Sequence, residues 1–225
     1  MAIRVERGRD GIAEVVVDVP PVNALTACDL GALAATLEDL GRDAEVSVVI
    51  LRSGIGQGFV AGLDVTETGD DTAAAVETSQ AAAAAYSAVS GCDVPVIAAV
   101  HGFCLGPGVG LVANADVIVA SEDASFGLPE ADCGRLGLVP HLARLVPPSK
   151  ARWLAYSCER IGADELHAYG TVERVVPRED LLAVARNLAG TIAAATAVAV
   201  RRVKESLRTS DDAGLAARGV LSARQ

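Results

Sequence analysis

The sequence predicts one α/β domain built from recurring strand, strand, helix units. Residues 96–100 form a short apolar run rich in β-branched residues, bounded by Pro95 and Gly102, which is typical of a strand buried on both faces. Three glycines at alternate positions, 106, 108 and 110, follow this run and lead into an apolar segment that could be helical. A second buried strand is expected at residues 116–120. The glycines do not match the G-x-G-x-x-G spacing of a dinucleotide-binding fold, which argues against that class.

The first forty residues predict a hairpin followed by a helix. Residues 2–7 and 12–18 have the apolar patterns of two strands, and Asp10-Gly11 between them is a hairpin turn signal. Thr26 is expected to cap the next helix, with Asp29 three residues later completing the cap. The helical spacing of leucines 30, 33, 37 and 40 predicts that this helix extends to Gly41.

The rest of the chain alternates in the same way. Residues 46–51 predict another buried strand, Asp64 is expected to cap a helix, and the alanine-rich stretch 73–90 is helical by propensity. Later helices are expected at 139–146, 149–157 and 163–168, with a short strand within 170–177 and one or two helices over 180–207. We therefore divide the chain into a core, residues 1–180, and a C-terminal helical segment, residues 181–225.

Composition excludes several classes of function. A length of 225 residues fits one domain with a substantial core, and 51% hydrophobic but only 3% aromatic residues make that core mostly Ala, Val and Leu. The net charge of −10 argues against nucleic acid as a partner. No apolar run is long enough to cross a membrane, and no signal peptide is evident, so we expect no membrane partner and a cytoplasmic location. Five cysteines without a C-x-x-C pair indicate a reducing compartment and no metal site.

Four motifs, in order, carry a resemblance to a known family. They are P-P-V-N-A-L at 20–25, G-F-V-A-G-L-D-V at 58–65, the strand and glycine turn at 96–110, and F-G-L-P-E at 126–130. Together they resemble the crotonase superfamily, also called enoyl-CoA hydratase/isomerase, over about residues 15 to 180. The resemblance implies a ClpP-like ββα superhelix with C-terminal helices, here shortened. It also implies a homotrimer or homohexamer whose substrate is an acyl-CoA thioester, with no metal or redox cofactor.

The resemblance also implies an oxyanion hole made by two backbone N–H groups, which stabilise the enolate or related oxyanion of the thioester. The first donor would be the N–H of Leu63. The second motif position is Pro107, which has no N–H. Two interpretations follow: half of the oxyanion hole is missing and the activity is lost, or the N–H of Gly108 replaces it after a shift of the turn. The remaining residues expected to contact the thioester flank these donors, namely Ala61, Gly62, Asp64, Gly106 and Pro107 itself.

The acid/base residues depart from the family pattern. Hydratase members use two glutamates; the later one is present as Glu130, but the earlier position, twenty residues before it, is Gly110. Glycine cannot transfer a proton, so two-glutamate hydration is disfavoured. The position used by other members, eight residues after Glu130, holds Leu138. Asp132 and His141 are the candidates that could compensate.

Three functions remain open. The first is a lyase or isomerase of this family that uses one glutamate. The second follows from residues 127–147, which resemble an actinobacterial subgroup acting on CoA thioesters from steroid or alicyclic ring breakdown, including hydrolytic C–C ring opening. The third is a non-catalytic paralogue that binds a CoA ester or another subunit. His101 and His141 each have a structural alternative to catalysis. Six later cations could contact CoA phosphates or simply face solvent, namely Arg144, Lys150, Arg152, Arg201, Arg202 and Lys204.

Overall fold

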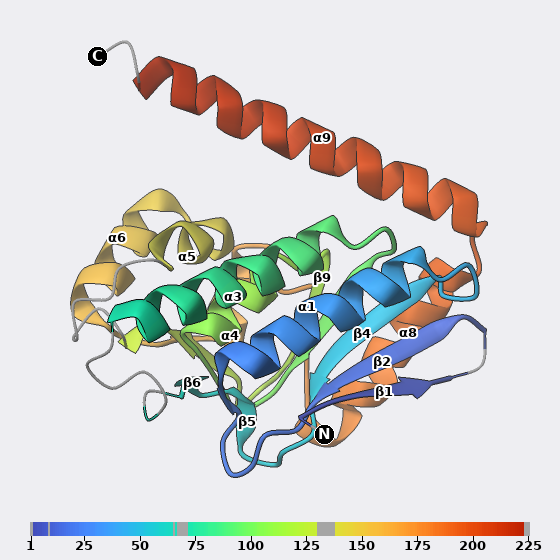
Figure 1. The fold of residues 1–225 in the computed structure, drawn as a ribbon, viewed down its shortest axis with the longest axis horizontal. Coiled ribbons are helices and arrows are strands. Elements are labelled where there is room, and N and C mark those ends of the chain that lie inside the picture. Colours follow the sequence, from blue (N-terminus) through green and yellow to red (C-terminus); the bar gives the residue numbers. More distant parts are fainter. Residues whose placement is uncertain (1, 9, 65, 67–71, 130–137, 223–225) are drawn as a thin grey trace.

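The computed structural model describes residues 2–8, 10–64, 66, 72–129 and 138–222, without the side chains of 72 and 210–222. Three sheets organise the described chain (Figure 1). The largest has six strands in the order β1 (Ile3–Arg7), β2 (Ile12–Val17), β4 (Val48–Ser53), β7 (Val96–Val100), β9 (Val117–Ser121) and β12 (Arg174–Val176). Its β1–β2 pair is antiparallel and its other pairs are parallel. The second sheet has the order β11 (Ile161–Gly162), β10 (Ser125–Gly127), β8 (Phe103–Leu105) and β5 (Gly58–Val60), and the third pairs β3 (Ala24–Leu25) with β6 (Gly62–Leu63).

From β4 to β10, the strands other than β6 alternate between the two larger sheets, which confirms the predicted ββα superhelix. Each unit contributes one strand to the six-stranded sheet and the next to the four-stranded sheet. The units are β4 and β5 before α3 (Thr72–Gly91), β7 and β8 before α4 (Pro107–Val112), and β9 and β10 before α5 (Val139–Leu145). This repeat brings β5 and β8 side by side, and with them the two motifs expected to form the oxyanion hole.

The central strands of the six-stranded sheet, β2, β4, β7 and β9, are buried on both faces, as their continuous apolar runs predict. On one face Leu51 and Val100 belong to the main core, which also contains side chains from α1 (Ala27–Arg42), α3 and α4. On the other face Ile50 and Ile97 belong to a smaller core beneath α8 (Leu181–Ala193). Helix α8 therefore packs directly on the sheet, while the division of the chain at residue 180 stays a prediction.

Most of the predicted elements are confirmed. The hairpin turn has Asp10 at φ 65° and Gly11 at φ 75°. The first helix starts with the expected capping box, in which the Thr26 side chain accepts from the Asp29 N–H and the Asp29 carboxylate accepts from the Thr26 N–H. The later helices also fall where expected, as α5, α6 (Pro148–Ser157), α7 (Ala163–Ala168) and, after a 3₁₀ turn at Arg178–Asp180, α8.

Three expected boundaries were wrong. The strand expected at 46–51 runs over Val48–Ser53, and the one expected at 116–120 runs over Val117–Ser121. In both cases parallel pairing with neighbouring strands sets the ends, and apolar content does not: β4 pairs with β2 over Val48–Ser53, and β9 pairs with β7 from Val117 and with β12 up to Ser121. The last helix does not end near residue 207, because α9 (Ala197–Ser222) continues to Ser222.

Helix α9 is held to the core by two cations. Lys204, only 6% exposed, donates to Val94 O at 2.9 Å and to Asp116 Oδ2 at 2.7 Å. Arg201 donates to the carbonyls of Gly41, Asp43 and Val46 near the end of α1. These two residues were open candidates for CoA phosphate contacts, and here their charges satisfy backbone carbonyls and a carboxylate. No single described helix is long and apolar enough to span a membrane; the bent pair 178–193 and 197–209 meets the length and composition test only together.

Glu14 predicts an acid-sensitive contribution to stability. Its buried carboxylate accepts from Arg52 Nε and Arg186 Nε, each at 2.6 Å, which joins β2 to β4 and α8. Burial raises the pKa of Glu14, but hydrogen bonds from Arg186 and Arg52 outweigh it and the net pKa is lowered. A lowered folded-state pKa contributes stability that is full above the unfolded value of about 4.3 and is lost as pH falls through the folded value.

We expect Glu14→Gln to lower the free energy of unfolding by roughly 2 kcal/mol at pH 7, because hydrogen bonds to a charged group weaken and Arg186 is partly exposed. Denaturant titrations between pH 7 and pH 3 measure this. The difference in the free energy of unfolding between wild type and variant should narrow below about pH 4. Glu122→Gln, at an exposed position, is the control and should show little change. A difference in the free energy of unfolding that does not change with pH would contradict the predicted link between Glu14 protonation and stability.

Candidate active site

The N–H of Leu63 faces away from the strand that supports it. In the β3–β6 pair, Leu25 lies opposite Leu63, and the N–H of Asp64, the next residue, donates to Leu25 O at 2.9 Å. Because successive N–H groups of a strand point to opposite sides, the N–H of Leu63 points away from β3. This is the orientation that an oxyanion donor requires.

The side chain of Asn23 supports β5, the strand that leads to Leu63. Its side chain is fully buried and makes four polar contacts: Oδ1 accepts from Val19 N–H at 2.7 Å, and the two hydrogens of Nδ2 are shared among Val17 O at 3.2 Å, Ser53 Oγ at 2.9 Å and Phe59 O at 2.8 Å. One side chain thus ties the ends of β2 and β4 to β5, the strand that leads into Leu63. The P-x-N-A motif contained this residue, but the sequence did not indicate its partners.

At the glycine turn, α4 begins at Pro107. Gly106 precedes it with φ 51° and ψ −117°, and its carbonyl accepts from Val109 at 2.9 Å and from Gly110 at 3.2 Å. Gly108 is consequently the first α4 residue with an N–H, which is what the second interpretation of Pro107 requires. An added Cβ at Gly108 would lie 3.0 Å from Val60 Cβ, so the start of α4 packs closely against the strand that leads to Leu63.

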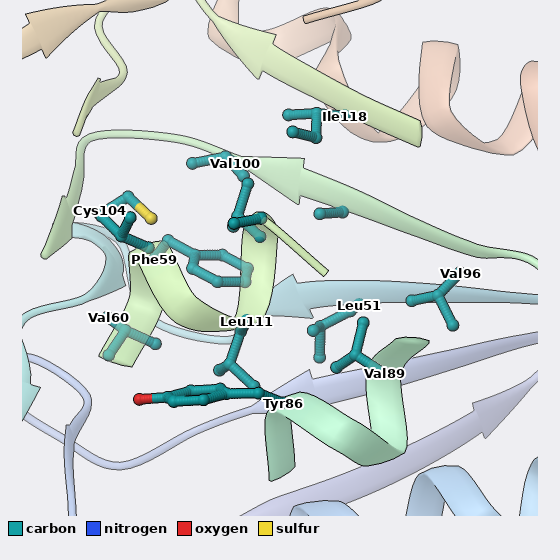
Figure 2. Close-up of a cluster of buried hydrophobic side chains, with 14 of the residues drawn as sticks. Leu51, Phe59, Val60, Tyr86, Val89, Val96, Val100, Cys104, Leu111 and Ile118 are labelled. Atoms are coloured by element: carbon teal, nitrogen blue, oxygen red, sulfur yellow. The ribbon is translucent and has the colours of Figure 1, made fainter. Parts of the chain in front are cut away.

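The space beside Gly110 is filled by an aromatic ring. A Cβ at this position would lie 2.5 Å from Tyr86 Cζ and 2.6 Å from Cε1, closer than packed atoms come. Tyr86 projects from α3 and is 6% exposed; Figure 2 shows it in the buried cluster with Leu111 of α4. The position of the family's first glutamate therefore lacks a carboxylate, and it has no room for a side chain while the Tyr86 ring keeps this place.

His141 lies next to this ring. Its imidazole and the Tyr86 ring meet edge to face with centroids 4.8 Å apart, and its Nδ1 lies 3.0 Å from Asn114 Nδ2. Burial, and then the charge of Arg144, lower the pKa of His141, which favours the neutral ring. The interpretation of His141 as a contact residue is consistent with these partners. Neither Tyr86 nor Asn114 was singled out from the sequence, because only the folded chain brings α3, α4 and α5 together.

Of the other candidates, His101 and Asp64 have described contacts, whereas two acidic residues lie outside the described part of the chain. His101 has a structural contact, with Nε2 2.9 Å from Ile55 O, and burial lowers its pKa. Asp64 accepts from the Thr66 N–H at 2.9 Å and from Thr66 Oγ1 at 2.6 Å, as expected for a helix cap. Glu130 and Asp132 lie outside the described residues. The oxyanion roles of Leu63 and Gly108, and the thioester contacts of Ala61, Gly62, Asp64, Gly106 and Pro107, stay predictions.

This is the architecture of a crotonase-fold protein: a spiral of ββα units, with Leu63 of β6 close to the glycine turn that starts α4. The model of the family described as enoyl-CoA hydratase/isomerase matches residues 7–221, and the chain belongs to this family of enzymes that act on acyl-CoA. Among solved structures, the enoyl-CoA hydratase of Bacillus anthracis is similar with a TM-score of 0.86 and 30% identity, over 92% of this chain and 82% of that one. A probable enoyl-CoA hydratase of Mycobacterium thermoresistibile has a TM-score of 0.87 and 29% identity, over 99% and 93%.

Curated relatives carry a more specific name. A Rhodococcus jostii protein named (7aS)-7a-methyl-1,5-dioxo-2,3,5,6,7,7a-hexahydro-1H-indene-carboxyl-CoA hydrolase is 48% identical over 90% of this chain and 79% of its own length. A Mycobacterium tuberculosis protein of the same name is 44% identical over 89% and 82%. A carnitinyl-CoA dehydratase of Salmonella typhimurium is 32% identical over 89% and 78%. The predicted resemblance to an actinobacterial subgroup acting on ring-derived CoA thioesters is thereby confirmed.

Proposed function

We propose that this enzyme opens a carbon ring by hydrolysing a C–C bond of a cyclic β-keto acyl-CoA. The observation that carries the proposal is the Tyr86 ring against Gly110, since it leaves no room for the first of the two glutamates that hydration needs. The two relatives named as hydrolases of a bicyclic dione carboxyl-CoA support the same chemistry. The proposed class is therefore a hydrolase, and the lyase expected from the family pattern is its alternative.

The proposed reaction consumes one water and needs no redox partner. Glu130 takes a proton from water, whose oxygen attacks the ring ketone carbon. The bond between this carbon and the carbon next to the thioester then breaks, and its electron pair spreads onto the thioester oxygen as an enolate. Glu130 then returns its proton to the enolate carbon, and the new carboxylic acid loses its own proton to solvent, which yields a ring-opened acyl-CoA with a new carboxylate. The N–H groups of Leu63 and Gly108 would stabilise the enolate oxygen, each contributing roughly 3 kcal/mol if already in place.

The test is a comparison of substrates. We expect turnover of a cyclic β-keto acyl-CoA to a ring-opened acid, detected by mass spectrometry with one oxygen from ¹⁸O-labelled water, and no hydration of a simple enoyl-CoA. Enoyl-CoA hydration without ring opening would overturn the proposal in favour of one-glutamate lyase chemistry. Binding of both thioesters with no turnover of either would favour the non-catalytic alternative.

We expect Glu130→Gln to lower kcat by about 10²-fold or more, because the amide cannot accept the proton from water. Calorimetric titration with the substrate should show unchanged binding, since the amide keeps the size of the carboxylate. Glu159→Gln, at an exposed position on the surface, is the control and should keep full activity. Equal turnover in the Glu130 variant would remove this residue from the mechanism.

The proposal includes a homotrimer or homohexamer in the cytoplasm, with coenzyme A only as part of the substrate. Light scattering after gel filtration tests the assembly: a monomer or dimer would contradict it.

A further inference from the structure

Asn114 lies just past the end of α4 and is 8% exposed, and its side-chain orientation is determined by its partners. Its Nδ2 is 2.7 Å from Gly110 O, a carbonyl that can only accept. The opposite orientation would place Oδ1 against that carbonyl, with two acceptors in contact. The amide nitrogen therefore faces Gly110.

The same nitrogen then determines the tautomer of His141. Asn114 Nδ2 has two hydrogens, and its second partner is His141 Nδ1 at 3.0 Å. A donor at this distance requires a lone pair on Nδ1, so the ring proton must be on Nε2. A doubly protonated ring would set Nδ1–H against the amide hydrogens. Among the described residues, the groups around the ring add no negative charge, since Tyr86 faces it from α3 and Arg144 follows on α5.

We infer that Asn114 is a positioning residue that holds His141 as the neutral Nε2–H tautomer, so that His141 donates a hydrogen bond to a carbonyl oxygen of the substrate ring. In this state neither ring nitrogen is a base: Nε2 carries the proton, and the lone pair of Nδ1 is engaged by Asn114. The position suits this role, because the Asn114 side chain donates a hydrogen bond back to Gly110 O, two residues after Gly108 in the same helix. This inference rests on the proposed function.

The protein contains its own reference signals for the test. It has three histidines, and the other two contact backbone carbonyls through different nitrogens: His101 through Nε2 to Ile55 O, and His167 through Nδ1 to Val172 O. Nitrogen-15 NMR of ring-labelled histidines at pH 8 should group His141 with His101, with Nε2 protonated, and apart from His167. A protonated Nδ1 in His141 would overturn the inference without any assay of activity.

Asn114→Asp reverses the hydrogen bond, because a carboxylate can only accept. We expect the His141 proton to move to Nδ1 and its pKa to rise by about one unit or more. With a cyclic β-keto acyl-CoA, kcat should fall about 10²-fold with a smaller change in KM. Asn187→Asp, with the same charge change on the exposed side of α8, is the control and should alter neither. An unchanged tautomer in a folded Asn114 variant would also overturn the inference.

A comparison of His141→Gln with His141→Leu distinguishes a hydrogen-bond donor role of His141 from a role in packing alone. Glutamine can offer an amide N–H near the position of Nε2, so it should keep more of kcat than leucine does. Equal losses in the two variants would contradict a donor role. The two proposals fail in different ways: the expected tautomer without any ring opening would remove the proposed function, whereas ring opening with Nδ1 protonated would remove only this inference.

Discussion

Asn23→Ala is expected to lower the free energy of unfolding by about 4 kcal/mol. The change leaves Val19 N–H and Phe59 O without the buried partner that they share, at about 1 to 3 kcal/mol each. It also removes the contacts to Val17 O and Ser53 Oγ, which keep hydrogen bonds from the N–H groups of Gly54 and Ile55. Alanine would also have to adopt φ 53°, which adds about 1 kcal/mol. Denaturant unfolding followed by circular dichroism measures the loss.

Two further variants divide this loss between its causes. Asn23→Gly tolerates the positive φ, so it should be about 1 kcal/mol more stable than Asn23→Ala. Ser53→Ala removes only one partner and should cost about 1 kcal/mol. Asn23→Ala and Ser53→Ala costing the same would show that the network does not depend on Asn23.

Lys204→Met is expected to cost roughly 3 kcal/mol. The variant keeps the apolar stem but leaves Val94 O and Asp116 without the ammonium group that they share, and Asp116 keeps part of its hydration because its side chain is 31% exposed. Hydrogen exchange should speed up over residues 197–209, because the start of α9 loses one of its two anchors. Arg202→Met, on the exposed side of the same helix, should stay within about 0.5 kcal/mol. Equal effects of the two variants would show that the Lys204 ion pair does not hold α9.

Local signals carried most of the fold prediction. The first helix follows from leucine spacing and the Thr26–Asp29 cap, and the hairpin follows from Asp10-Gly11, because these signals act over a few residues. The strand ends were missed by one or two residues, since pairing between distant strands determines them. The end of α9 was missed because its last turns continue past the apolar pattern that located its start.

The candidate site was predicted only where a motif contained it. Leu63, Gly106 and Gly108 lie inside contiguous motifs, so their backbone could be located from the sequence. The contacts of Asn23 with Ser53 and Phe59, and of Asn114 with His141, join residues 27 to 36 positions apart. No periodicity in a single sequence encodes such pairs, and they became visible only when the units of the superhelix were stacked.

The contact between Gly110 and Tyr86 also constrains how this chain could evolve or be redesigned. A glutamate at 110 would collide with the Tyr86 ring, and removing the ring first would leave a hole in the core with nothing gained at the site. A route to a two-carboxylate hydratase would therefore need changes at both positions, because a glutamate introduced alone would first have to displace the Tyr86 ring from the core.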